Sequence, residues 1–175
     1  MNERMPRYVE ITLRKRSVAC VAALLDEHAP HTCRAVWEAL PQEGDVYHAK
    51  YASNEIYALV PAFPAEPPGV ENGSIVPAKG DVGYFHLPAG TRLPADAQRS
   101  LGGQAVVDLA LFYDRNNILL SPSEGYLTCN VFATVVRNLE QVTVAGNDIW
   151  RAGAIGERLA FRRLEGAALE RWGLA

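Results

Sequence analysis

The sequence predicts a mainly β protein: a closed eight-stranded antiparallel barrel with one or two capping helices. Three observations lead to this fold class. Strand-like runs of five to nine residues recur along the whole chain, separated by turns and proline-rich loops. Strong helical periodicity is confined to one segment near the N-terminus. No internal repeat and no low-complexity tract is present, a pattern typical of a single sheet closed on itself.

Composition supports a single domain over residues 1–175. The chain is 49% hydrophobic and 21% charged, close to an average soluble protein. A domain of this length buries roughly 70% of its unfolded surface, so it folds without disulfides or a structural metal. The net charge of -3 and a pI near 5.8 argue against a nucleic-acid partner, which needs a basic surface.

The chain carries no sign of membrane insertion or export. No apolar run approaches the roughly 18 residues of a membrane helix, and Met1–Pro6 is polar rather than the start of a signal peptide. Cys20, Cys33 and Cys129 are odd in number and lie in apolar contexts, where we expect buried thiols. We therefore expect a cytoplasmic protein without a cofactor.

The first two strands form a predicted hairpin. Val9, Ile11 and Leu13 alternate with polar residues, the pattern of a half-buried strand. The apolar run 17–25 is its expected partner, across a short basic turn at residues 15–16.

A helix is predicted next, over residues 30–40. Pro30 suits the first helical position, where its missing N–H has no helical partner. Cys33, Val36, Trp37 and Leu40 then fall on one face, which makes Trp37 a candidate core residue. Pro41 ends the helix.

The middle of the chain alternates strands with long loops. Runs 45–52 and 55–60 are predicted strands joined by Ser53 and Asn54. The stretch 61–94 holds seven of the eleven prolines and is a predicted loop, with one strand inside it at 81–86. A second long loop is predicted at 87–104, and long loops in compact domains are often functional.

The C-terminal third continues the barrel. The predicted strands are 105–113, 128–136 and 156–162. Residues 114–117 have the composition of a turn, and Asn138 is a candidate cap for a short helix over 138–144. A second short helix is predicted at 164–172.

Several segments resemble cyclophilins. Ala29–Leu40 reads Ala-Pro-His-Thr-Cys-Arg-Ala-Val-Trp-Glu-Ala-Leu, similar to the first cyclophilin helix, and Tyr47-His48 stands where cyclophilins carry Phe-His-Arg. Val131–Val136 is similar to a late Val-Phe-Gly-Lys-Val strand, and Leu111–Tyr113 to a Gln-Phe-Phe strand. Together with Gly80–Phe85 and the proline-rich loop, these segments resemble bacterial cyclophilin-like proteins of unassigned function. The resemblance spans residues 8–162 and implies an eight-stranded barrel with capping helices.

The chain departs from cyclophilins where their chemistry lies. Prolyl isomerisation has a barrier of about 18–20 kcal/mol, and cyclophilins are thought to lower it with an arginine near the prolyl amide. Here Ala49 follows His48, and Lys50 lacks the rigid donor fork of arginine. Leu109 or Ala110 stands where the family has glutamine. These departures make peptidyl-prolyl isomerisation the third of three candidate functions.

One group of candidate site residues lies on a predicted hairpin. Alternation places His48 and Lys50 on one strand face, and Glu55 begins the next strand across a tight turn. Such a set suits an anionic or amide-bearing small molecule, and the histidine is a possible general base. The competing interpretation is that all three are solvated residues on a surface hairpin.

Four further residues are candidates for ligand contact. Tyr84, His86 and Tyr113 are polar aromatic side chains on strands that flank the long loops, and ordinary barrel packing explains each of them equally well. Asp108 stands alone in an apolar run, so a structural pairing with an arginine is the simpler expectation. No metal-ligand set is expected.

The favoured function is a small-molecule binder or enzyme that uses the barrel groove. Cyclophilin-like domains occur in bacterial enzymes acting on urea-derived carbon–nitrogen bonds, so the resemblance implies amide or carboxylate metabolites, of an identity that the residues leave open. The alternative is a non-catalytic homo-oligomer that assembles through its proline-rich loops.

Overall fold

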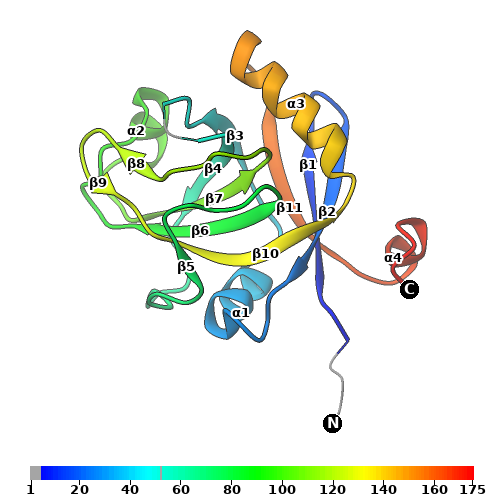
Figure 1. The fold of residues 1–175 in the computed structure, drawn as a ribbon. Coiled ribbons are helices and arrows are strands. Elements are labelled where there is room, and N and C mark those ends of the chain that lie inside the picture. The colour runs from blue at the N-terminus through cyan, green and yellow to red at the C-terminus, as the bar shows by residue number, and fades with distance from the viewer. Residues whose placement is uncertain (1–4, 52) are drawn as a thin grey trace.

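Eight antiparallel strands close into a barrel in the computed structural model, which describes residues 5–51 and 53–175 (Figure 1). Around the barrel the strands follow the order β2 (Val18–Leu24), β1 (Tyr8–Leu13), β11 (Arg158–Leu164), β3 (Gln42–His48), β4 (Glu55–Pro61), β7 (Val106–Phe112), β6 (Asp81–Leu87) and β10 (Cys129–Arg137). Pairing of β10 with β2 closes the sheet. The predicted fold class is therefore confirmed.

Smaller elements lie outside the barrel. β5 (Gly73–Ser74) extends the sheet beside β10, and β8 (Leu120–Ser121) pairs with β9 (Gly125–Tyr126) in a separate hairpin. The described helices are α1 (Pro30–Ala39), α2 (Ala95–Leu101), α3 (Leu139–Ala152) and α4 (Ala167–Arg171). In Figure 1, α1 lies below the barrel and α3 above it, while α2 and the β8–β9 hairpin lie beside β4 and β6.

The barrel interior is filled by alternate residues of each strand. In β1 these are Val9, Ile11 and Leu13, all at most 2% exposed, and the register with β2 sets Ile11 opposite Cys20. The alternation of apolar and polar residues that predicted this hairpin thus corresponds to the alternation of side chains between its inner and outer faces. The three cysteines are buried and free, as expected, and burial raises the pKa of Cys20 and of Cys33 to about 12.

Strand β7 is buried on both faces. Val107, Leu109 and Leu111 join the barrel interior, whereas Val106, Ala110 and Phe112 pack in clusters on the outer face. This explains its almost continuous apolar sequence, because neither face contacts bulk water. The outer face is covered by the predicted long loop after β6, within which α2 lies, and by the segment after β7, where only a turn at residues 114–117 was predicted.

Helix α1 begins at Pro30 and ends at Ala39, as its sequence predicts. Trp37, however, is only partly buried, and lies between the guanidinium groups of Arg7 and Arg163 at 5.0 and 5.2 Å. The carboxylate of Glu71 accepts hydrogen bonds from the backbone N–H groups of His31 and Thr32, at 3.1 and 2.7 Å. These bonds satisfy free N–H groups of the first helical turn and anchor the proline-rich loop to the barrel.

Several local predictions were wrong. Strand β3 ends at His48, so Lys50 lies in the following turn rather than on the strand face that it was expected to share with His48. Helix α3 continues to Ala152, well beyond the predicted end at residue 144. Asn138 does precede α3, but in a left-handed conformation, and its amide donates to the Ala19 carbonyl instead of capping the helix.

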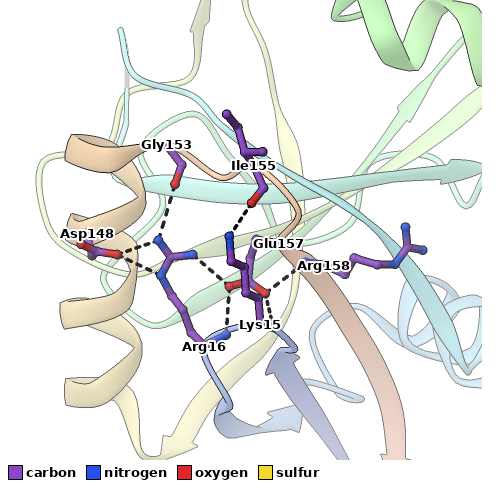
Figure 2. Close-up of polar contacts among 7 residues, drawn as sticks. All are labelled: Lys15, Arg16, Asp148, Gly153, Ile155, Glu157 and Arg158. Atoms are coloured by element: carbon purple, nitrogen blue, oxygen red, sulfur yellow. Dashed lines mark hydrogen bonds and ion pairs between the residues drawn. The ribbon is translucent and has the colours of Figure 1, made fainter.

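The β1–β2 turn is held by a buried carboxylate (Figure 2). Glu157 accepts hydrogen bonds from the backbone N–H groups of Lys15 at 2.7 Å, Arg16 at 3.2 Å and Arg158 at 3.1 Å, and from Arg16 Nη1 at 2.9 Å. The same guanidinium also donates to Asp148 of α3. Every oxygen of Glu157 is therefore paired, which is the requirement for burying an ionised group.

Candidate functional site

A cavity of about 420 Å³ lies on the outer face of the barrel. Its floor is formed by side chains of β4, β6 and β7, and its walls by the segments 88–94 and 119–124 from the two long loops. The volume is in the range of small-molecule sites. The predicted long loops supply the wall at 88–94, whereas the wall at 119–124 comes from a segment that was not predicted to be a long loop.

Strand register brings the floor residues together. Leu59 of β4 and Phe85 of β6 both lie opposite Asp108 of β7, and opposite residues of antiparallel strands share a face. Glu55 and Tyr57 lie on the same face of β4, at alternate positions. The floor therefore carries two acidic side chains among apolar and aromatic ones.

Glu55 and Asp108 are buried, at 5% and 9% exposure. Burial raises the pKa of Glu55 to about 7, against a hydrogen bond of 2.8 Å from the Ser53 hydroxyl that lowers it. Burial, and then the negative charge of Glu55, raise the pKa of Asp108 well above its ordinary value. Within residues 5–51 and 53–175 neither acid has an ion pair with a basic side chain. The prediction that Asp108 pairs with an arginine is therefore wrong within the described residues.

His48 forms a pair with Tyr113. Its Nε2 lies 2.7 Å from the tyrosine hydroxyl. Burial, and then the charge of Lys50, lower the pKa of His48 to about 4, so the ring is neutral near pH 7. Donation from the hydroxyl to Nε2 leaves one unpaired group, Nδ1–H, whereas the opposite direction leaves two. The first arrangement leaves fewer unpaired groups. In it, His48 Nε2 accepts from Tyr113 and the proton of the neutral ring is on Nδ1.

Five of the seven sequence-predicted residues line the cavity, namely His48, Lys50, Glu55, His86 and Asp108. Tyr84 and Tyr113 do not. Tyr84 is buried in the barrel interior and donates its hydroxyl to the Phe63 carbonyl at 2.6 Å. Tyr113 is completely buried and packs against Gly146 of α3, where an added Cβ would lie 2.5 Å from the ring.

Unpaired polar atoms of the described residues gather at this cavity. Three buried side-chain atoms lack a hydrogen-bond partner there: His48 Nδ1, His86 Nδ1 and Asp108 Oδ1. All three residues line the cavity. Asp108 lies on the cavity face of the sheet, whereas His48 and His86 lie opposite Ile56 and Val107, whose side chains fill the barrel interior. Because buried polar groups are paired almost everywhere in native proteins, the unpaired oxygen of Asp108 is an exception on the cavity floor.

Sequence reasoning missed most of the other residues of the cavity, among them Tyr57, Phe85 and Arg92. Tyr57 and Phe85 lie on strands and were indistinguishable from core residues, because the covering loops place the outer face of these strands out of water. Arg92 comes from the loop after β6 and brings an exposed guanidinium to the cavity, although no arginine follows His48. Its one sequence signal was its place in a long loop.

Two classes of site have no support in the described part of the chain. No group of three or more His, Cys, Asp or Glu side chains there is arranged to hold a metal ion. None of its helices is long and apolar enough to cross a membrane.

The fold is similar to that of McbB, at low sequence identity. A structure of McbB in complex with tryptophan aligns with a TM-score of 0.60 and 19% identity over 90% of this chain and 45% of McbB. This chain therefore spans less than half the length of McbB. The solution structure of the hypothetical protein AF2241 from Archaeoglobus fulgidus aligns with a TM-score of 0.46 and 22% identity, over 93% of this chain and 99% of that one.

Sequence comparison identifies the family. No curated protein matches the chain. A family model matches residues 11–161, from the middle of β1 to the middle of β11, so the match includes the whole cavity. The chain belongs to the DUF3830 family, which is described as a protein of unknown function.

Proposed function

We propose that the cavity on β4, β6 and β7 binds a small metabolite that carries amide or carboxylate groups. The observation that carries this proposal is the pair of buried acids on the cavity floor, Glu55 and Asp108, of which Asp108 Oδ1 has no hydrogen-bond partner among the described residues. A bound molecule that donates hydrogen bonds to these carboxyl groups offsets the penalty of an unsatisfied buried group, about 1–3 kcal/mol.

The chemistry of the walls supports the same class of ligand. Lys50 and Arg92 place positive charges at the exposed side of the cavity. Tyr57 and Phe85 add apolar surface for a carbon skeleton. McbB, whose fold is similar, has been solved in complex with tryptophan, a small molecule with a carboxylate.

A thermal-shift screen tests the proposal. The panel contains amino acids, their N-carbamoyl derivatives, primary amides and dicarboxylates, each at millimolar concentration. A compound present at 100 times its Kd stabilises the folded state by about 2.7 kcal/mol, which raises Tm by roughly 5–10 °C in a chain of this size. His48→Ala and Glu55→Ala should abolish the shift. His28→Ala and Glu66→Ala, at exposed positions away from the cavity, should retain it. Absence of any shift across the panel refutes the proposal.

The position of Arg92 favours prolyl isomerisation, since this arginine lines the partly apolar cavity. The buried acids favour a different ligand. A prolyl amide has no N–H and offers no donor to Asp108, whose unpaired oxygen would stay unpaired. We therefore expect no acceleration of cis–trans isomerisation over the background rate in a proline-peptide assay. Acceleration would favour prolyl isomerisation over metabolite binding.

Self-association is a second candidate function. Exposed apolar side chains occur on the proline-rich loop and near the β8–β9 hairpin: Val70, Ile75, Val76, Ile118, Leu120 and Tyr126. The backbone hydrogen bond of 2.8 Å from Leu119 to Ile75 joins the two segments. Light scattering after size exclusion tests this candidate, and a monomer at micromolar concentration excludes it.

A further inference from the structure

Charge is divided by depth in the cavity. Both acids, Glu55 and Asp108, are at least nine-tenths buried, whereas Lys50 and Arg92 are exposed. No ion pair within residues 5–51 and 53–175 joins one of these acids to one of these cations. The buried part of the cavity is therefore acidic, and its exposed part is basic.

The acidic part is electrostatically unsatisfied. An ionised carboxylate removed from water costs several kcal/mol unless a cation or hydrogen-bond donors compensate it. Glu55 has one neutral donor, the Ser53 hydroxyl, and Asp108 Oδ1 has none among the described residues. The other titratable side chains that line this part or contact its charges are Tyr57, His86 and Cys129, and none of them is a cation paired with the acids.

A ligand group is favoured here if it donates hydrogen bonds, and more strongly if it is positive. When an acid of the pair is ionised, a second carboxylate is disfavoured, because like charges in a poorly solvated site repel strongly. At the exposed side the preference is reversed, since Arg92 suits a carboxylate or phosphate through its planar donors.

We infer that the buried end of the ligand is a nitrogen group that donates N–H to Asp108, an ammonium or a primary amide, and that an anionic group at its other end lies against Arg92. This inference rests on the proposed function and narrows it from any amide or carboxylate to molecules that carry N–H donors and an anion at opposite ends.

Four probes with one carbon skeleton separate the possibilities: 5-aminopentanoate, glutaramate, glutarate and pentanoate. They share one carboxylate and differ at the other end, which is an ammonium, a primary amide, a second carboxylate or a methyl group. Isothermal titration calorimetry measures each Kd on the intact chain. We expect 5-aminopentanoate and glutaramate to bind about tenfold or more tightly than glutarate and pentanoate. The ratio of the first two Kd values tells an ammonium from an amide.

Variants locate the selectivity. Asp108→Asn should reduce the preference for 5-aminopentanoate over pentanoate by about tenfold, because the amide keeps the shape of the side chain and removes its charge. Glu66→Gln removes one exposed acid outside the cavity and should leave the preference unchanged. Arg92→Ala should weaken all four probes by a similar factor, because all four carry the carboxylate.

A second measurement needs no variant. Wild-type titrations with 5-aminopentanoate in buffers of different ionisation enthalpy report the protons released on binding. We expect release near pH 6.5, because the arriving ammonium favours ionised acids and a proton of the acid pair passes to the buffer. Any one of three results overturns the inference. They are equal Kd values for glutarate and 5-aminopentanoate, an unchanged preference of Asp108→Asn for 5-aminopentanoate over pentanoate, and no binding of any probe at 10 mM. If another compound of the thermal-shift screen still binds in the cavity, the proposed function stands and only this inference about the two ends of the ligand fails.

Discussion

Replacement of Glu55 by glutamine should change how the stability of the protein depends on pH. Glu55 is 5% exposed, and burial raises its pKa from 4.5 to about 7. Between these values the folded chain holds a proton that the unfolded chain has released, so wild-type stability falls as pH rises through this window. Each pKa unit corresponds to about 1.4 kcal/mol, which gives a total loss of about 3 kcal/mol above pH 7. Glutamine does not titrate and can still accept the Ser53 hydrogen bond.

Urea unfolding of both proteins from about pH 5 to about pH 8 measures this effect. The stability of Glu55→Gln relative to wild type should increase by about 2.5 kcal/mol from pH 5 to pH 8, because the wild type loses stability as Glu55 ionises. Glu157→Gln is the matched control, since Glu157 is 1% exposed but has four hydrogen-bond donors. A difference between Glu55→Gln and wild type that stays constant over this range would show that Glu55 is not held protonated by burial.

Three further predictions concern the scaffold. Glu157→Gln should lower the free energy of unfolding by about 3 kcal/mol at neutral pH, measured by urea unfolding, because it removes one partner of a buried ion pair. Gly146→Ala should cost about 1–3 kcal/mol and disturb the Tyr113 signals in NMR spectra, because the new Cβ meets the ring at 2.5 Å. Tyr84→Phe should cost about 1 kcal/mol through the lost bond to Phe63 and leave probe affinity unchanged, as titration calorimetry would show.

Much of the barrel was predictable because its strands obey local rules. The alternation in Val9–Leu13 identifies an inner and an outer face, and Pro30 and Pro41 bracket the helix α1. The limits of α3 were less accessible. Asn138, which precedes the helix, donates its side-chain amide to the Ala19 carbonyl instead of capping α3. Ala19 is more than a hundred residues away, and no local sequence signal indicates that contact.

The cavity was only partly predictable, since it depends on which face the loops cover. Glu55 and Asp108 were identifiable as acids in apolar surroundings, but their common face follows from the β4–β7 register. Lys50 was placed on a strand because alternation continued past His48, while the chain turns there instead. Arg92 reaches the cavity through the path of a long loop, which periodicity cannot describe.

Strand β7 contributes to two compartments at once. Its even-numbered residues, Asp108 among them, contact the cavity and the covering loops, while Leu109 and Leu111 fill the barrel. Under the proposed function, adjacent positions of one strand are subject to separate constraints, one for ligand choice and one for folding. Relatives with this architecture can therefore acquire new specificities by changing every second residue and the overlying loops, without repacking the interior.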